Sequence, residues 1–346
     1  MIPILYAENE YEFLTYGIGG LSEASRCLVT EERNGQYELV MDYPASGALF
    51  SEIQHSRKIL ATPSDGVRPQ PFEIYKISKP INGMTTINAQ HVSYQLTLIP
   101  VAPFTATTCP AALAGIKSNS LESNPFEFWT DKTLMANYSQ TVPQSARERL
   151  GGVRGSILDV YGGEYEWDRY TVKLHASRGQ DNGASLRYGK NITDIKQEEN
   201  IASTYTGAVG VWTGKDENNQ DVCVYTDAVQ TDSADAYPYH RTTVLDFTAE
   251  YQNQPTKEQL TARTRSYLRD NDYGVPKVNL KVSFIPLWET EEYKELAVLE
   301  HINLCDVVTV YFEKLDIHAK AKVVKTVYDV LLDRYKSIEI GDAKTY

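Results

Sequence analysis

The sequence predicts a mainly β protein with an inserted α+β unit, in which two small antiparallel β-barrels are joined by α/β connector segments. Three observations lead to this fold class. The first hundred residues contain two hairpin signals, the middle is punctuated by Pro and Gly around short helix patterns, and the end alternates apolar with polar residues. The 24 Tyr against 9 Phe fit this class, because Tyr favours pleated, half-buried surfaces and protein interfaces.

At 346 residues the chain exceeds a typical single domain, so its length predicts two or three domains. Changes in sequence texture place the boundaries. The expected segments are the N-terminal part of the first barrel (1–100), an inserted α+β domain (101–185), the return strands of the first barrel (186–235), an α/β connector (236–275) and the second barrel (276–346).

Two Asn-Gly pairs predict hairpins in the first segment. Strand-like residues 27–30 and 37–41 flank a turn with Asn34-Gly35. Residues 72–77 and 85–89 flank Asn82-Gly83 in the same way. Asn-Gly supplies the positive φ angles that a tight hairpin turn needs. The two hairpins together predict an antiparallel sheet or small barrel.

The inserted unit is predicted from short helices with clear stops. Residues 145–150 precede Gly151-Gly152, which end a helix. Ser156 caps a second helix that Gly162 ends, and residues 111–117 form another short helix candidate. The alternation in residues 164–167 and 170–175 then predicts a strand pair around Asp168-Arg169.

The connector carries the clearest helix signal of the chain. Strand-like texture returns in residues 184–195, 205–212 and 222–225, followed by a strand in residues 242–251. A helix is then expected from Thr256 to about Asp270, because Pro255 precedes it and Gly274 follows it.

The last segment is the most regular. Four runs alternate apolar with polar residues, namely 278–284, 307–312, 319–328 and 335–341. A period of two implies one buried and one solvated face, which predicts a small closed antiparallel barrel. Lys320, Lys322 and Lys325 lie on or near the solvated face, and we expect them to protect exposed strand edges.

Charge and cysteine usage exclude several classes of protein. A net charge of −12 argues against general affinity for DNA or anionic membranes, which need positive surfaces. No run approaches the roughly 18 apolar residues of a membrane-spanning helix, and residues 1–8 lack the basic flank of a signal peptide. The four cysteines lie far apart without a CxxC pair, so we expect buried free thiols, a reducing compartment and no zinc site.

No catalytic, cofactor-binding or metal-binding residues are predicted. The six histidines make no HExxH motif, no Ser lies in GxSxG, and SxxK does not occur. The acidic loop 214–221 misses the spacing of an EF-hand and is expected to be a solvated hairpin tip. A nucleophilic Cys–His pair stays open, with Cys109, or Cys305 with the nearby His301, as its candidates.

Three stretches of the chain carry a family resemblance. They are residues 151–168, residues 186–192 and residues 321–335. These stretches resemble the prophage tail endopeptidase family, the tail-associated hub proteins of long-tailed phages of Gram-positive bacteria. The chain resembles tail proteins of Listeria phages or prophages, and the family is similar to the baseplate hub of contractile tails.

The resemblance implies a structural role in a virion tail tip, after synthesis in the host bacterial cytoplasm. Two barrels per subunit, in a homotrimer, form a ring of near-sixfold symmetry that continues the tail tube and lets DNA pass. The implied partners are further copies of the chain, the distal tail protein, other tail-tip and tape-measure proteins, and the host cell surface. Lytic activity in this family generally lies in an additional C-terminal region, so we expect no enzymatic activity and no cofactor here.

Two other functions remain open from the residues alone. One is a tail-associated peptidase or cell-wall hydrolase that uses Cys109 or Cys305. The other is a receptor- or glycan-binding module that uses exposed aromatic side chains such as Trp212 and Trp288. A core or interface position is the simpler expectation for both Trp residues.

Overall fold

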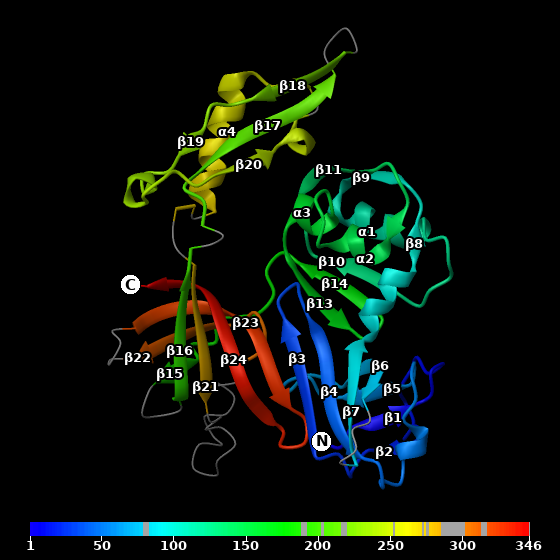
Figure 1. Cartoon of the computed structure of the whole chain (residues 1–346). Coiled ribbons are helices and arrows are strands. Elements are labelled where there is room, and N and C mark those ends of the chain that lie inside the picture. Colours follow the sequence, from blue (N-terminus) through cyan, green and yellow to red (C-terminus); the bar gives the residue numbers. More distant parts are fainter. Residues whose placement is uncertain are drawn as a thin grey trace.

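The computed structural model is mainly β, as predicted, and contains a long sheet, an α/β unit beside it and a small sheet with one long helix (Figure 1). No helix in the described part of the chain is long and apolar enough to cross a membrane. The structure describes residues 1–78, 83–187, 192–201, 204–215, 220–251, 253–271, 273–274, 277–284, 302–312 and 317–345.

The first hundred residues build one half of the long sheet from antiparallel neighbours. The predicted hairpin at Asn34-Gly35 is confirmed, with Asn34 at a φ of +56°. Asn82 lies outside the described residues, but the strands that flank it do pair. Alternate side chains of these strands are buried in one core. The strands are β1 (Ile4–Tyr6), β2 (Gly19–Gly20), β3 (Arg26–Glu32), β4 (Tyr37–Pro44), β5 (Lys58–Ala61), β6 (Gln70–Ser78) and β7 (Met84–His91); the 3₁₀ turns are η1 (Phe50–Glu52) and η2 (Val92–Leu98).

The other half of the long sheet comes from the end of the chain, where all four alternating runs form strands. These are β21 (Lys277–Phe284), β22 (Val307–Phe312), β23 (Ile317–Asp329) and β24 (Arg334–Thr345). The last five residues of β23 pair with β3, so the two halves join into one 13-stranded sheet. The expectation that lysines protect an open edge here is wrong. β23 is paired on both sides, and Lys322 and Lys325 form ion pairs with Glu164 and Glu32.

Closure of the sheet into two barrels is not confirmed, because the strand order of the described residues is an open path. The structure also corrects the expected return of residues 186–235 to the first half of the sheet. β15 (Ser185–Arg187) pairs with β22, and β16 (Ile192–Asn200) pairs with β21. The path from β16 through β21, β24, β23 and β22 thus ends at β15, the strand that precedes β16 in the sequence.

The inserted unit has its helices where the sequence places them. Ser145 and Glu148 form a capping box, Ser156 caps the next helix, and Gly162 ends that helix with a φ of +63°. The elements are β8 (Pro100–Val101), β9 (Phe104–Thr108), α1 (Cys109–Ser118), β10 (Glu127–Thr130), β11 (Met135–Gln140), β12 (Gln144–Ser145), α2 (Ala146–Leu150), α3 (Ile157–Tyr161), β13 (Glu164–Asp168) and β14 (Thr171–His175).

The small sheet occurs between β16 and β21 in the sequence and has hydrophobic cores of its own. Its central strand pairs with β18 and β19 on one side and with β20, in parallel, on the other. The predicted helix is confirmed, with Thr256 and Gln259 in a capping box. The elements are β17 (Gly207–Lys215), β18 (Asp221–Tyr225), β19 (Val229–Gln230), η3 (Ala234–Ala236), β20 (Thr242–Asp246), η4 (Thr248–Glu250) and α4 (Lys257–Asp270).

Candidate functional site: a charged cleft where three segments meet

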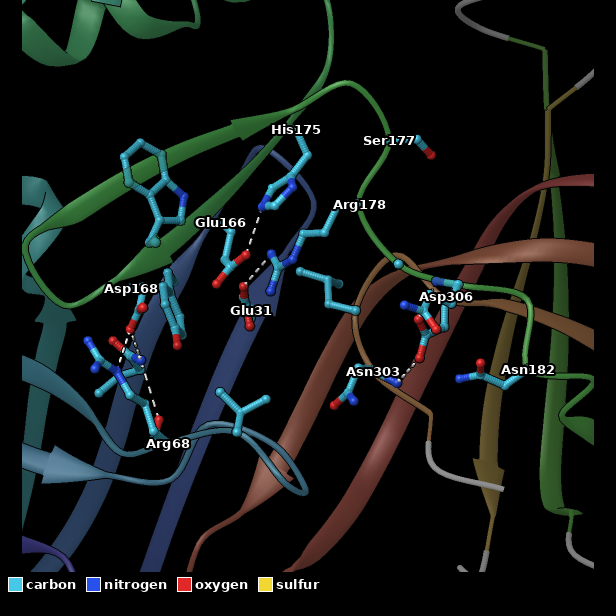
Figure 2. Close-up of a pocket in the computed structure, with 17 residues that line it drawn as sticks. Glu31, Arg68, Glu166, Asp168, His175, Ser177, Arg178, Asn182, Asn303 and Asp306 are labelled. Carbon is cyan, nitrogen blue, oxygen red and sulfur yellow. Dashed lines mark hydrogen bonds and ion pairs between the residues drawn. The ribbon is translucent and has the colours of Figure 1, made fainter. Parts of the chain in front are cut away.

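A cleft of about 570 Å³ lies where the β13–β14 hairpin meets the long sheet (Figure 2). Three parts of the chain line it: the N-terminal strands with the loop before β6, the inserted hairpin with the segment that follows it (177–182), and the loop that precedes β22. Charged and other polar side chains make up most of the wall, among them Glu31, Arg68, Glu166, Asp168, His175 and Arg178.

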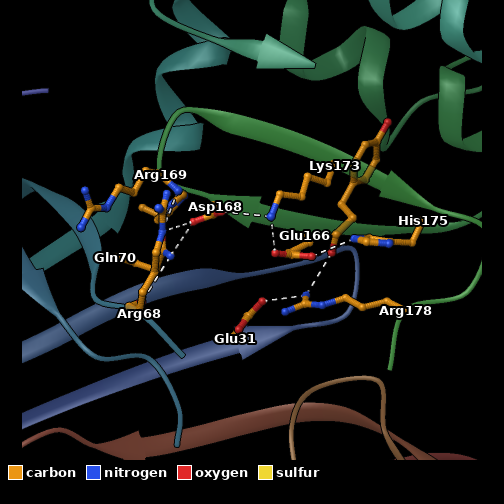
Figure 3. A network of polar contacts seen from close by, with 11 residues as sticks. Glu31, Arg68, Gln70, Glu166, Asp168, Arg169, Lys173, His175 and Arg178 are labelled. Atoms are coloured by element: carbon orange, nitrogen blue, oxygen red, sulfur yellow. Dashed lines mark hydrogen bonds and ion pairs between the residues drawn. The ribbon is translucent and has the colours of Figure 1, made fainter. Parts of the chain in front are cut away.

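The hairpin supplies a row of alternating charges (Figure 3). Glu166 and Lys173 are direct cross-strand neighbours, so the Lys173 ammonium donates to Glu166 at 2.9 Å and to Asp168 at 3.0 Å. His175 Nε2 lies 2.8 Å from the other Glu166 oxygen. Burial opposes ionisation of Glu166, but the bonds from Lys173 and His175 outweigh it and hold the pKa of this carboxyl below its usual value.

Two ion pairs attach the β13–β14 hairpin and the segment that follows it to the two halves of the long sheet. Arg178 donates to Glu31 on β3 at 2.9 Å and to the carbonyl of Tyr165 at 3.0 Å, and Glu31 is only 4% exposed. Glu164 accepts from Lys322 on β23 at 2.8 Å. These two ion pairs, one in the cleft wall and one beside it, therefore connect β3, β13 and β23.

A neutral histidine connects this network to the core. Gln70 donates to Asp168 at 3.1 Å, and its carbonyl oxygen accepts the backbone N–H of Arg169 at 2.6 Å. The same oxygen lies 3.3 Å from His91 Nε2, while His91 Nδ1 accepts from the N–H of Ser93 at 3.2 Å. Because Nδ1 accepts, Nε2 must carry the proton. Burial lowers the pKa of His91 to about 3.

The buried histidine predicts a loss of stability in mild acid. Unfolded His91 takes up a proton below its ordinary pKa of about 6.5, whereas the folded side chain does so only near pH 3. The unfolded state thus binds more protons between these values, and stability falls by up to about 1.4 kcal/mol per pH unit as the pH drops. Urea denaturation at pH 7.5, 6 and 5 measures this slope.

The His91→Gln variant should flatten the slope, because it removes the proton site. His55→Gln, at an exposed position, is the matched control and should leave the slope unchanged. An identical slope in wild type and His91→Gln contradicts the assignment.

The cysteines predicted as nucleophile candidates do not meet the requirements of one. Cys109 is buried at the start of α1, its thiol lies 3.8 Å from the Thr130 hydroxyl, and burial raises its pKa. Burial also raises the pKa of Cys305 to about 12. A nucleophilic cysteine needs a thiolate and a nearby base. His301, the proposed base for Cys305, lies outside the described residues.

The tryptophan and acidic-loop candidates also show no binding site in the described residues. Trp212 is 3% exposed and donates to the Tyr251 carbonyl at 3.1 Å, so it is a core side chain and not an exposed binding aromatic. Trp288 and residues 216–219 of the acidic loop lie outside the described residues. The described residues contain no group of three or more His, Cys, Asp or Glu side chains that could hold a metal ion.

The ion pairs of the cleft can hold segments together. Its described wall lacks a hydroxyl placed next to a base, the geometry that hydrolysis would need. His175 is hydrogen-bonded to Glu166, an arrangement in which a histidine can act as general base toward a hydroxyl. The nearby Ser177, however, points away from both side chains in Figure 2. The Ser177 hydroxyl instead lies 3.3 Å from Lys322. We therefore interpret the network as a junction between segments.

This junction was not predicted from the sequence. A usable signal was present, since acidic residues alternate in 164–168 and basic residues alternate in 171–175. Opposite charges at alternate positions of two paired strands share one face and bind each other. The distant partners, Glu31 and Lys322, carried no such local signal.

Comparison with known proteins agrees with this fold. Residues 180–345 match the family model described as prophage endopeptidase tail. No curated protein matches the chain. Among solved structures, the prophage tail protein gp18 from Listeria monocytogenes superposes with a TM-score of 0.63 at 13% identity, covering 99% of this chain and 94% of that one.

Two further tail proteins share the fold over nearly their whole length. The 43 kDa tail protein of prophage MuSo2 from Shewanella oneidensis has a TM-score of 0.64 at 11% identity, and covers 98% of each chain. The tail protein from Neisseria meningitidis has a TM-score of 0.60 at 8% identity, covering 99% of this chain and 96% of that one. The match of residues 180–345 to the prophage endopeptidase tail model confirms the family resemblance seen in the sequence.

Proposed function

We propose that this protein is the structural hub of a phage tail tip, where three copies form a ring that continues the tail tube and lets DNA pass. The observation that carries the proposal is the fold, which matches three tail proteins, two of them from prophages, over 98% or more of this chain. A tail location follows for the chain, with the distal tail protein and other tail-tip or tape-measure proteins as its neighbours. The host surface is reached through the same tip.

Three features of the chain support a ring that lets DNA pass. The long sheet has an N-terminal and a C-terminal half joined at β3 and β23, so each copy offers two β modules, and three copies would offer six. A ring also requires head-to-tail contacts, for which sheet edges and Tyr-rich surfaces are suited. The net charge of −12 favours passage of DNA without binding, because proteins bind DNA through Lys and Arg that neutralise its phosphates.

We propose that the chain works without catalysis. The thiol pKa values of Cys109 and Cys305 are raised. In the charged cleft, Glu166 and Glu31 accept hydrogen bonds from Lys173 and Arg178. Incubation with purified peptidoglycan is therefore expected to release no fragments, and Cys109→Ala is expected to behave as wild type in that assay.

The ring is tested by mass photometry of the full-length chain, alone and with the distal tail protein of the same phage. Trimers are the expected species, at least in the presence of that neighbour, because assembly shifts with partner concentration. Electron microscopy of tails made without this chain should show tubes that lack a closed tip. Monomers under both conditions, or normal tips without the chain, contradict the proposal.

A further inference from the structure

Strand β18 is a free edge of the small sheet. Among the described strands only β17 pairs with it, whereas β20 on the other side of the sheet lies toward the inserted unit (Figure 1). There Asp246 forms an ion pair with Arg154, and η4 contacts β11. The small sheet therefore has one edge covered by its own chain and one edge open.

The backbone of the open edge presents unused hydrogen-bonding groups. The N–H of Thr226, next to β18, donates to the carbonyl of Gly210 in the register that pairs Tyr225 with Val211. Bonded and non-bonded pairs alternate along an antiparallel ladder. The N–H and C=O groups of Tyr225, Cys223 and Asp221 therefore point outward, away from β17. This row of donors and acceptors matches another extended strand.

The side chains of β18 lack the protection usual at an exposed edge. Natural edges carry Lys, Pro or bulges that prevent pairing with another chain. β18 reads Asp-Val-Cys-Val-Tyr, with a single charge at its first position. Val222 and Val224 are only half-buried on the face that α4 covers, and Tyr225 on the other face is 63% exposed. A further strand would complete the burial of both valines.

We propose that β18 pairs antiparallel with β18 of a second copy of this chain, about a twofold axis at Cys223. In this register Asp221 lies opposite Tyr225 of the second copy, and Val222 lies opposite Val224. No like charges face each other along the strand, which matters for a chain of net charge −12. All three outward-facing residues are used, so the strand is complementary to itself.

This contact is separate from the proposed ring. A twofold contact uses the same surface on both copies, whereas a ring of three needs two different surfaces. Five residues bury little area, so the pair is expected to be weak in solution and to require trapping.

The proposed register places the two copies of Cys223 opposite each other, where a disulfide can link them. Two residues in a hydrogen-bonded antiparallel pair have Cα atoms about 5.5 Å apart. That separation lies within the range of roughly 4.4–6.8 Å for a disulfide. Cys223 is exposed, whereas Cys27, Cys109 and Cys305 are buried. Mild oxidation of the full-length protein should therefore link two copies through Cys223 alone.

The experiment compares rates of dimer formation under copper–phenanthroline, read on non-reducing gels. The reference for random collision is the double variant Cys223→Ser, Val244→Cys, because Val244 is 63% exposed on the opposite strand of the same sheet. Wild type is expected to form the linked dimer at least tenfold faster than this reference. The single variant Cys223→Ser should form none.

A proline separates strand pairing from mere exposure of the thiol. Tyr225→Pro removes an outward N–H that β17 does not use, so the small sheet keeps its own ladder. With Cys223 retained, this variant should fall to the collision rate, while its circular dichroism melting curve shows that it is folded. Equal rates for wild type and the Val244→Cys reference, or full linking in a folded Tyr225→Pro protein, overturn the proposal.

Discussion

Replacing Arg149 with methionine is expected to lower the free energy of unfolding by about 3–5 kcal/mol, the largest single effect in the inserted unit. Arg149 on α2 is fully buried. Its Nη2 lies 3.2 Å from the carbonyls of Val101 and Ala102 and 3.0 Å from that of Val142. The guanidinium also lies 5.2 Å from the centre of the Phe104 ring.

The stability falls because the Arg149 guanidinium is a donor that three backbone carbonyls share. Methionine fills much of the same volume but removes the donor from the buried carbonyl of Val101 and from the partly buried carbonyls of Ala102 and Val142. Each buried group that stays unsatisfied costs about 1–3 kcal/mol. Urea denaturation followed by circular dichroism measures the change. Arg265→Met, at an exposed position on α4, is the matched control and should unfold like wild type. A shift of less than about 1 kcal/mol for Arg149→Met contradicts this role.

Arg178→Met is expected to cost a similar amount, about 3–5 kcal/mol, because it leaves a buried carboxylate without its cation. Glu31 on β3 is 4% exposed and accepts from Arg178 at 2.9 Å. The variant should also loosen the β13–β14 hairpin from the long sheet, since Arg178 donates to the Tyr165 carbonyl as well. Hydrogen exchange of β13 amides reports that second effect.

Two comparisons make the Arg178 prediction specific. Arg68→Met removes the other cleft arginine, which is 53% exposed in its pair with Asp168, and should cost no more than about 1 kcal/mol. Adding Glu31→Gln to Arg178→Met removes the stranded charge and should restore part of the stability. If the double variant is as unstable as the sum of the two single variants, the pair is not coupled.

Local signals in the sequence predicted local structure well. Asn34-Gly35 marks its hairpin because Asn tolerates the positive φ found there. Thr256 and the Pro255 before it locate α4 because caps and proline act within one turn of a helix. The alternation in the last segment likewise identified all four of its strands.

Neighbour relations were harder to predict, because periodicity tells which residues form a strand and not which strand lies beside it. The sequence pattern of β16 is the same as that of the strands of the first half. β16 nevertheless pairs with β21, and the small sheet lies between these two strands in the sequence. The cleft follows the same rule. The Glu166–Lys173 pair is local to one hairpin, whereas the Glu31–Arg178 pair depends on how distant segments pack.

The pairing of β3 with the end of β23 also has a consequence for biosynthesis. Residues 28–32 of β3 find their partners in residues 325–329, so a ribosome makes the second strand roughly 300 residues after the first. During translation β3 carries an unpaired side that the nascent chain cannot yet cover. We expect the N-terminal half to depend on a chaperone, or on a transient partner, until the last strands are released.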